Sequence, residues 1–445
     1  MNPDYSVYRS RRERVYDAIG NGVAVLFAAP ERMRSNDTEY PYRQDSYFYY
    51  LSGFTEPEAV LILNGQTRTS TLCCRPKDPD METWVGFRYG PDLAADVFGF
   101  EAACNTAEWQ NRLQQALHHA DSIYALWQHD GVADADIMGL WRKLCADVAY
   151  RKIDGNIITP AQQLGDLYPI LDEMRLIKDA HEIDLLRRAG QLSAEAHNKA
   201  MQAACNGVTE YQLEAEILYH FMRHNARSPS YNSIVAAGKN ACTLHYVQNN
   251  ATLVDGQLVL IDAGAEYGYY AGDITRTFPV NGRFSGAQKA VYDIVLAANQ
   301  QAIAAIKPGV LWQEVSDVAL QVLVQGLVDL KLLRGSVDDN IATQTYRRFY
   351  MHGIGHWIGL DVHDVGGRFY QGQPRRLCEN MCTTIEPGLY INAADDIPVE
   401  FHNIGIRIED NIRVSATAAE VYTAATPKQC SDIEALMREN RFSRQ

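Results

Sequence analysis

The chain has 445 residues, of which 47% are hydrophobic and 22% are charged, the balance of an ordinary globular protein with room for about two domains. A formal net charge of −14 excludes nucleic acid as the main partner, because its phosphates would be repelled. No apolar run is long enough to span a bilayer, and no apolar stretch follows the first basic residues, so we expect neither a secretory signal nor a membrane partner.

The cysteines also indicate the cellular compartment of the protein. There are nine, scattered along the chain, which does not indicate a disulfide framework. Cys378 and Cys382 are close enough to suggest a metal site, but no second Cys or His pair lies nearby in sequence. We therefore predict a cytoplasmic protein with reduced thiols, and Cys378 and Cys382 buried as small apolar residues.

The first half of the chain predicts a mixture of strands and helices. Val23–Phe27 and Ala59–Leu63 are short apolar runs bounded by Gly, Pro or Asn, which is typical of buried strands. Trp109–Ala120 has helical spacing of its apolar residues, and Leu167–Lys178 is interpreted as a connector that leads into a helix.

A long helical pattern starts at Glu182, directly after this connector. We therefore place a domain boundary close to Arg175. The sequence predicts an N-terminal domain of residues 1–174 and a second domain of residues 175–445.

In the second half, helices are predicted at Thr209–His224, at Ser285–Ile306 after a Ser-x-x-Gln capping box, and at Val310–Leu330. Gln257–Ala263 is a continuous apolar strand that contains an acid, and Ile404–Val414 alternates like a half-buried strand. Acids within apolar strands are costly unless they are paired or bind a metal.

The first two such acids are Asp262 and Asp273. A hairpin turning at Tyr267-Gly268 would place them directly opposite each other on one face, about 5 Å apart at Cβ. A cation between the carboxylates would remove their repulsion. The alternative, a strand-end acid and an unrelated turn acid, is equally compatible with these two residues alone.

Two glutamates extend the pattern. Glu409 shares a strand face with Arg407, so an ordinary salt bridge is the simpler interpretation of that pair. Glu386 ends another apolar strand before Pro387-Gly388, where a turn acid is the local alternative.

Three histidines follow one another within MHGIGHWIGLDVHD. His352 and His356 have the i, i+4 spacing of the helical zinc motif, but Gly353 stands in place of the catalytic Glu and, with Gly355, disfavours a helix. We interpret the segment as a glycine-rich strand or loop at a site, with His363 shortly after it.

Together, two Asp, one His and two Glu suit two divalent cations that prefer oxygen ligands. Manganese fits this mix best, and zinc or cobalt are the alternatives. Two metals in one site would hold a bridging hydroxide at neutral pH and stabilise a tetrahedral intermediate.

Four segments carry a resemblance. LIDAGAEYGYYAGDITRTFPV, HGIGHWIGLDVHD, TIEPGLY and GIRIEDNI, in this order, resemble the pita-bread metallopeptidases, which include methionine aminopeptidase, prolidase and aminopeptidase P. The resemblance implies an α+β protein whose catalytic domain is a curved antiparallel sheet covered by helices. It also implies metal ligands at Asp262, Asp273, His356, Glu386 and Glu409.

The first half narrows this resemblance. RRERVYDAIGNGVAVLFAA and YPYRQDSYFYYLSGFTEPEAVLIL are similar to the N-terminal domain of aminopeptidase P, which methionine aminopeptidases lack. The implied activity is hydrolysis of the N-terminal Xaa-Pro bond of peptides by a hydroxide bound to two metals. Prolidase, which acts on Xaa-Pro dipeptides, is the alternative, and a scaffold that has lost catalysis would be expected to lack some ligands.

The resemblance also implies roles around the metals. His245 would hydrogen-bond the scissile peptide, and Tyr231 would line the substrate end. His352 and His363 would hold the proline residue and the developing charge.

Two further roles concern the ligands themselves. Glu386 would also take the proton from the nucleophilic water, and Arg407 would hold the carboxylate ligands in place.

The sequence departs from the family pattern before Glu386, where Asn380 stands in place of a turn Gly. Asn adopts left-handed backbone readily, so we expect the turn to persist. Tyr370 and Arg375 receive no assigned role. Trp84 lies where the family has an aromatic at the rim of the site, contributed by a neighbouring subunit, and the resemblance implies a homodimer or homotetramer.

Overall fold

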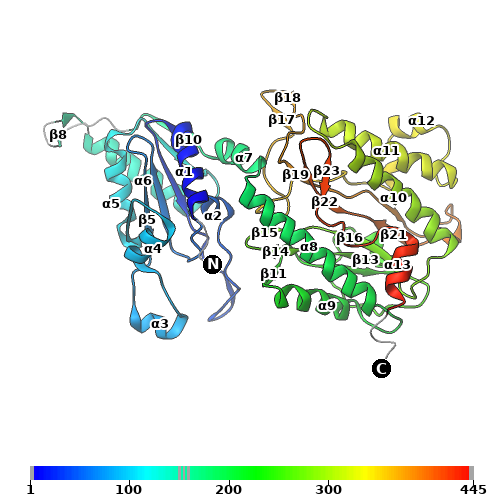
Figure 1. Cartoon of the computed structure of the whole chain (residues 1–445). Coiled ribbons are helices and arrows are strands. Elements are labelled where there is room, and N and C mark those ends of the chain that lie inside the picture. Colours follow the sequence, from blue (N-terminus) through cyan, green and yellow to red (C-terminus); the bar gives the residue numbers. More distant parts are fainter. Residues whose placement is uncertain (1–4, 149–151, 154–155, 158–160, 440–445) are drawn as a thin grey trace. The chain divides into compact units, whose positions relative to one another are not determined.

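The computed structural model describes residues 5–148, 152–153, 156–157 and 161–439 (Figure 1). Contacts within the chain separate it into two compact units, Met1–Glu173 and Met174–Gln445. No helix within the described residues combines the length and apolar character needed to cross a membrane.

The N-terminal unit is built on one mixed sheet of six strands in the order β10-β7-β1-β4-β5-β6. β4 pairs antiparallel with both β1 and β5, whereas β7 and β6 extend the sheet in parallel. The strands of this sheet are β1 (Val23–Phe27), β4 (Val60–Asn64), β5 (Thr69–Cys74), β6 (Ala102–Asn105), β7 (Ser122–Ala125) and β10 (Gln163–Asp166). Two small hairpins stand apart from it, β2 (Met33–Ser35) with β3 (Thr38–Glu39) and β8 (Lys152–Ile153) with β9 (Asn156–Ile157).

Helices and short 3-10 turns connect these strands. They are α1 (Ser6–Ile19), α2 (Ser46–Ser52), α3 (Pro79–Val85), α4 (Gly90–Phe98), η1 (Thr106–Glu108), α5 (Trp109–Ala116), η2 (Leu117–His119), α6 (Gly131–Val148) and α7 (Tyr168–Leu176). The predicted strand at Val23–Phe27 and the predicted helix from Trp109 are confirmed, and the connector at Leu167–Lys178 is itself mostly helix.

In the C-terminal unit every strand pairing is antiparallel within the described residues. The strands are β11 (Ser228–Pro229), β12 (Ile234–Ala237), β13 (Leu258–Asp262), β14 (Ala265–Tyr267), β15 (Tyr270–Ala271), β16 (Thr275–Pro279), β17 (Phe369–Tyr370), β18 (Gln373–Pro374), β19 (Cys382–Ile385), β20 (Gly388–Ile391), β21 (Ile404–Arg407), β22 (Asp410–Val414) and β23 (Ala419–Val421). The three-stranded groups are β12-β13-β16, β19-β22-β23 and β11-β14-β15.

Helices cover these strands, as Figure 1 shows. They are α8 (Ala180–Ala203), α9 (Glu210–Arg223), α10 (Gly286–Ala305), α11 (Trp312–Asp329), α12 (Val337–Ala342) and α13 (Cys430–Met437), with 3-10 turns η3 (Gly238–Cys242), η4 (Thr345–Arg348) and η5 (Val399–Phe401). One apolar core joins the inner faces of α8, α9, α10 and α11 to β13, β16, β19 and β21. The α+β class, with antiparallel strands beneath helices, is the expected one.

The start of α10 shows how the sequence fixes a helix end. Ser285 accepts the backbone N–H of Gln288, and Gln288 accepts that of Ser285, so the predicted capping box is formed. This satisfies two backbone donors that the first helical turn cannot pair internally.

The hairpin after Asp262 differs from the prediction by two residues in register. The turn lies at Gly268-Tyr269, where φ is 57° and 72°, as a two-residue type I′ turn requires. Asp262 therefore pairs with Thr275 and not with Asp273. Because a shift of two preserves which face a side chain points to, both aspartates still face the same way.

The predicted strand Ile404–Val414 is also corrected, because it is two strands in two different sheets. The break falls at Ile408-Glu409, whose N–H groups donate to Pro387 and Thr275 carbonyls outside the ladders. The break sets Glu409 at the junction of the two sheets.

Two smaller predictions have mixed outcomes. Asn380 adopts φ 70°, so the left-handed turn persists without Gly. Cys382 is buried as expected, but Cys378 is exposed and the prediction for it was wrong. All nine cysteines are free thiols.

Candidate active site

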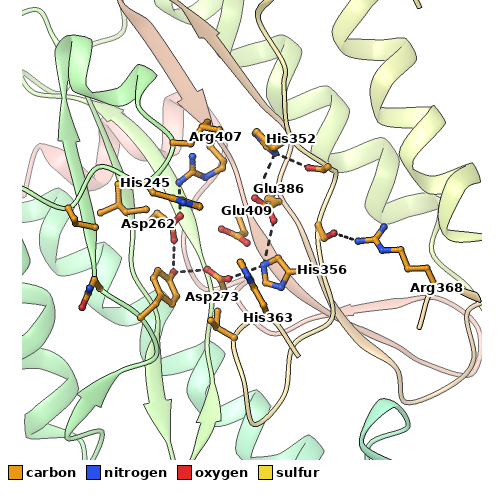
Figure 2. Close-up of a pocket in the computed structure, with 18 residues that line it drawn as sticks. His245, Asp262, Asp273, His352, His356, His363, Arg368, Glu386, Arg407 and Glu409 are labelled. Atoms are coloured by element: carbon orange, nitrogen blue, oxygen red, sulfur yellow. Dashed lines mark hydrogen bonds and ion pairs between the residues drawn. The ribbon is translucent and has the colours of Figure 1, made fainter. Parts of the chain in front are cut away.

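A cavity of about 540 Å³ lies in the C-terminal unit, and Figure 2 shows the side chains that line it. All ten residues named from the sequence are among them: Tyr231, His245, Asp262, Asp273, His352, His356, His363, Glu386, Arg407 and Glu409. The fold thus brings together residues that span 179 positions of sequence, from Tyr231 to Glu409.

Strand ends place the carboxylates. Asp262 is the last residue of β13, and Asp273 lies in the short link between β15 and β16. Glu386 follows β19, and Glu409 lies at the break between β21 and β22. Because the strands end here, the side chains converge while the apolar residues before them anchor the backbone in the core.

Tyr231 bridges the two aspartates. Its hydroxyl oxygen lies 2.5 Å from Asp262 Oδ1 and 2.6 Å from Asp273 Oδ1. A phenol carries one proton, so it can donate to only one carboxylate at a time. Burial, together with the charge of Asp262, raises the pKa of the Asp273 carboxyl, although His356 opposes this. The two carboxylates therefore repel each other across the Tyr231 hydroxyl.

His356 faces the carboxylates through Nε2, which lies 3.3 Å from Asp273 Oδ2 and 3.5 Å from Glu386 Oε1. Its Nδ1 donates to the Trp357 carbonyl at 2.9 Å, which fixes the ring and leaves Nε2 toward the cavity. Burial alone would lower the pKa of His356, but the hydrogen bond to Asp273 and the charges of Asp273 and Glu386 raise it to about 9.

Glu409 is the most deeply buried acid of the site, at 1% exposed. Its Oε2 accepts from Thr275, whereas Oε1 has no hydrogen-bond partner among the described residues. Burial, and then the charges of Asp273, Glu386 and Asp262, raise the pKa of Glu409 well above its ordinary value. Burial likewise raises the pKa of Glu386, to about 7.

These observations test whether a metal fits. Donor atoms of Asp273, His356 and Glu409 lie within 4.8 Å of one another, which suits coordination of a single ion. An orphaned buried carboxylate oxygen and several mutually repelling acids are the surroundings that a divalent cation neutralises.

Arg407 does not form the salt bridge with Glu409 that was the simpler interpretation of the strand. Its Nη2 donates to Asp262 Oδ2 at 2.5 Å, and Nη1 donates to the Tyr390 hydroxyl at 2.9 Å. Glu409 also lines the cavity, but its carboxylate accepts from Thr275 instead. Arg407 therefore orients Asp262.

The remaining histidines of the site differ in whether their ring nitrogens have hydrogen-bond partners. His352 Nδ1 lies 2.8 Å from the Gly353 carbonyl and Nε2 lies 2.9 Å from the Tyr390 hydroxyl, so both ring nitrogens are engaged. Burial and the nearby Arg407 lower the pKa of His352 to about 4. His363 packs its ring against His356 at 4.2 Å between centroids. Within the described part of the chain, the ring nitrogens of His245 and His363 have no hydrogen-bond partner.

Arg368, to which no role was assigned from the sequence, also lines the cavity (Figure 2). Its Nη2 donates to the Gly355 carbonyl at 2.6 Å, and its guanidinium lies over the Trp312 ring at 4.4 Å. Arg368 belongs to the polar segment GGRFYQGQPRR, whose hydrophobic residues show neither helical nor strand periodicity. Of the other residues left without a role, Tyr370 is exposed, and Trp84 is 84% exposed.

Four carboxylates, more than Arg407 and His356 can neutralise, lie beside two histidines with free ring nitrogens, and this arrangement is typical of a metal-dependent hydrolase site. Residues 184–416 match the profile of Metallopeptidase family M24, and residues 8–124 match that of Aminopeptidase P, N-terminal domain. The chain belongs to metallopeptidase family M24, and it binds divalent metal.

The similar proteins cover nearly the whole chain. Xaa-Pro aminopeptidases of Haemophilus influenzae and Escherichia coli are each 44% identical to it, over 97% of this chain and 96% and 97% of their own. Proline aminopeptidase P II from Yersinia pestis superposes with a TM-score of 0.94 at 45% identity, covering 98% of this chain and 100% of that one. Aminopeptidase P from E. coli with the inhibitor Pro-Leu superposes with the same TM-score at 43% identity, over 99% and 100%.

Proposed function

We propose that the protein is an Xaa-Pro aminopeptidase, a metalloaminopeptidase that releases the first residue of peptides with proline at the second position. The observation that carries this is the convergence of all five ligand-type residues, Asp262, Asp273, His356, Glu386 and Glu409, in one cavity. The relatives named above, at 44% identity over nearly the full length, support the proline specificity.

The N-terminal unit favours this activity over that of prolidase, because residues 8–124 match the N-terminal domain of aminopeptidase P. The assignment of residues 1–174 and 175–445 as separate domains stays part of the proposal.

We further propose that the five ligand-type residues hold two divalent ions, and that manganese is the metal, with zinc or cobalt as alternatives. Carboxylate-rich donor sets favour harder cations such as Mn²⁺. When bound, such ions would supply a hydroxide nucleophile at neutral pH and stabilise negative charge on the substrate oxygen.

The protein's own groups then have distinct tasks. Glu386 would accept a proton from the attacking water and deliver it to the proline nitrogen, since its carboxyl reaches the cavity beside His356. Arg407 and Tyr231 hold the Asp262 carboxylate from two sides, which fixes the geometry of that ligand.

The histidines would position the substrate. His245 and His363 have free ring nitrogens that can donate to the scissile carbonyl or its developing charge. His352 has both nitrogens engaged, so its ring offers an apolar wall for the proline. Proline suits such a wall because it is a tertiary amide with no N–H to satisfy.

The test is an assay of purified, chelator-stripped protein on Xaa-Pro-Xaa tripeptides and Xaa-Pro dipeptides, with and without Mn²⁺. We expect metal-dependent release of the first residue from the tripeptide. Cleavage of the dipeptide alone would identify a prolidase. Absence of cleavage with Mn²⁺, Zn²⁺ and Co²⁺ would refute the enzymatic proposal in favour of a binding or scaffold protein.

Two wider expectations belong to the same proposal. A cytoplasmic location agrees with nine free cysteines, because disulfides are rare in that compartment. A homodimer or homotetramer agrees with the exposed Trp84, a large aromatic that association would cover. Fractionation of cells and sedimentation of the purified protein measure these two properties.

A further inference from the structure

Two cysteines of the N-terminal unit lie directly opposite each other on neighbouring strands. Cys73 belongs to β5 and Cys104 to β6, and the two are register partners in this parallel pair. Their Sγ atoms lie 3.2 Å apart. Neighbouring strands are about 4.8 Å apart, which falls within the range of Cα separations that disulfides span. The backbone therefore already has the spacing of a disulfide, and the sulfurs only have to approach from 3.2 Å to about 2.05 Å.

The two sulfurs have unequal surroundings. Both cysteines belong to the apolar core that includes Leu113 of α5, but Cys73 is fully buried whereas Cys104 retains 5% exposure. Arg112, also on α5, is largely exposed, and its guanidinium interacts with the Cys104 sulfur. Cys104 is thus the member of the pair that lies nearer to solvent and beside a cation.

The same contacts separate the acidities of the two thiols. The hydrogen bond with Cys73 lowers the pKa of Cys104, and the charge of Arg112 lowers it further, while burial opposes both. That hydrogen bond, together with burial, raises the pKa of Cys73. The thiolate is the reactive form of cysteine, and a thiolate close to a second thiol is the arrangement of redox-sensitive cysteines.

Cys74, the next residue of β5, provides an internal comparison. Its side chain points to the other face of the sheet, because successive residues of a strand alternate. Its register partner on β6 is Asn105, so it has no thiol opposite it. Burial, and then the charge of Glu56, raise the pKa of Cys74 to about 12. Of these two adjacent cysteines, only Cys73 is placed to form a disulfide with β6.

We propose that Cys73 and Cys104 are a site of reversible oxidation, at which a hydroperoxide converts the two thiols into a disulfide between β5 and β6. The inference is independent of the proposed function, because both residues lie in the N-terminal unit and neither lines the catalytic cavity. β6 is the edge strand of its sheet. The disulfide ties this edge to β5 and closes residues 73–104 into a covalent loop.

The reaction proceeds in two steps. The Cys104 thiolate attacks one oxygen of the hydroperoxide, and the O–O bond breaks to give a sulfenic acid and an alkoxide or hydroxide, which takes a proton from water. The Cys73 sulfur then attacks the sulfenic sulfur, so that the S–S bond forms and the S–O bond breaks. The hydroxyl group leaves as water with the proton of Cys73. Two thiols are thereby oxidised by two electrons and the peroxide is reduced, and a dithiol reverses the change by thiol–disulfide exchange.

The experiment treats the reduced full-length protein with one equivalent of hydrogen peroxide. Remaining thiols are alkylated, the protein is digested without reductant, and the peptides are identified by mass spectrometry. We expect a peptide that links the Cys73 segment to the Cys104 segment and is lighter by two hydrogen atoms than its reduced halves. Treatment with dithiothreitol before alkylation should remove this peptide.

Three cysteine variants identify the sulfurs involved. Cys74→Ser should keep the link, whereas Cys104→Ser should lose it. Cys73→Ser should stop the reaction at the sulfenic acid of Cys104, which dimedone traps. Because Cys73 is fully buried, Cys73→Ala serves as a second variant, and circular dichroism checks that each protein is folded.

Two charged residues beside Cys104 give a matched pair of variants. Arg112→Gln should slow formation of the link by about threefold to tenfold, because the cation stabilises the thiolate. Glu108→Gln should not slow it, since the charge of Glu108 raises the pKa of Cys104. Glu108 also pairs with Arg112 at 3.1 Å, so the two variants alter the same surface with opposite sign.

Several outcomes would contradict the proposal. Peroxide consumption with both Cys73 and Cys104 recovered as alkylated thiols would overturn it, as would a disulfide that survives in Cys104→Ser. Loss of the link in Cys74→Ser would show that the wrong face of β5 was assigned. Equal slowing in the Arg112 and Glu108 variants would overturn the role of Cys104 as the attacking thiolate.

Discussion

Two acids that are neighbours in the sequence, Glu409 and Asp410, have opposite surroundings. Both are almost fully buried. Asp410 accepts from Arg276 at 2.8 Å, from Lys428 at 2.6 Å and from Thr423 at 2.7 Å. Despite burial, these two cations hold the pKa of Asp410 well below its usual range. Glu409 has one partner, an orphaned oxygen and a raised pKa.

The comparison teaches how a structural acid differs from a ligand. A buried charge that the protein has fully paired holds elements together, here β16, β22 and the segment before α13. A buried charge without a countercharge destabilises the fold, so its presence indicates a functional role such as metal binding. Glu409 and Asp410 are equally buried, so burial does not distinguish a ligand from a structural acid. The number of hydrogen-bond and ion-pair partners of each carboxylate does distinguish them.

The largest effect we expect is on activity in Glu409→Gln. The variant keeps the shape and the Thr275 hydrogen bond but removes a negative ligand. Because a metal contributes several kcal/mol to such reactions, kcat/KM should fall by about a thousandfold or more. Steady-state assays, together with metal content by mass spectrometry, measure this.

The same variant has a diagnostic effect on stability. Without metal at neutral pH, Glu409→Gln should unfold at a higher temperature than the parent protein, because it removes the repulsion that raises the pKa of Glu409. Near pH 5 the gain should shrink. A destabilised metal-free variant would show that Glu409 is a structural acid like Asp410.

The next largest effect is expected in Asp410→Asn. It leaves Arg276, which is fully buried, without its carboxylate. Breaking a buried ion pair by removing one partner costs about 3–5 kcal/mol of unfolding free energy, measured by chemical denaturation.

Metal binding in Asp410→Asn should remain within a few-fold of the parent protein, since no ligand changes. A variant that folds as stably as the parent, or one that folds but loses metal, would remove the distinction between the two acids.

A third expectation concerns metal addition to stripped protein. An ion that binds only the folded state at a hundred times its Kd adds about 2.7 kcal/mol of stability. Mn²⁺ should therefore raise the Tm of the parent protein and of Asp410→Asn, and raise that of Glu409→Gln much less. An equal increase in Tm for all three proteins would show that Mn²⁺ binds at a site that does not include Glu409.

Much of this architecture could be predicted from the sequence. The apolar run of β13 and the capping box of α10 are local signals, and both elements form where expected. The proximity of Asp262 and Asp273 was also expected. The register was not, because a turn at Gly268-Tyr269 needs a tyrosine at φ 72°, which propensity disfavours.

Other features depended on long-range contacts. The break at Glu409 is set by a backbone bond to Thr275, 134 positions away, and strand alternation gives no sign of it. Likewise, the sequence alone allowed Arg407 to pair with either Glu409 or Asp262. Only the three-dimensional structure identifies Asp262 as its partner. Arg368 lies on a loop without periodicity, so its position against Trp312 had no local signal.

The smallest expected effect concerns His197, which is fully buried on α8 and feels the charges of both Arg276 and Asp262. Nε2 lies 2.9 Å from the Ala263 carbonyl, and Nδ1 has no partner in the described structure. Burial lowers the pKa of His197 to about 4, against an ordinary value near 6.5. Below pH 6.5 His197 is protonated in the unfolded chain but stays neutral in the folded chain. The free energy of unfolding therefore falls as the pH drops toward 4.

Between pH 7 and pH 5 this one group should lower the unfolding free energy by about 2 kcal/mol. Denaturant titrations of metal-free protein at the two pH values, compared with His197→Gln, isolate the contribution, because the variant should lose less stability over that range. Equal losses would mean that His197 is protonated in the folded state. The negative charge of Asp262 would then outweigh burial and Arg276, and the carboxylates of the metal site would influence the fold beyond their own cavity.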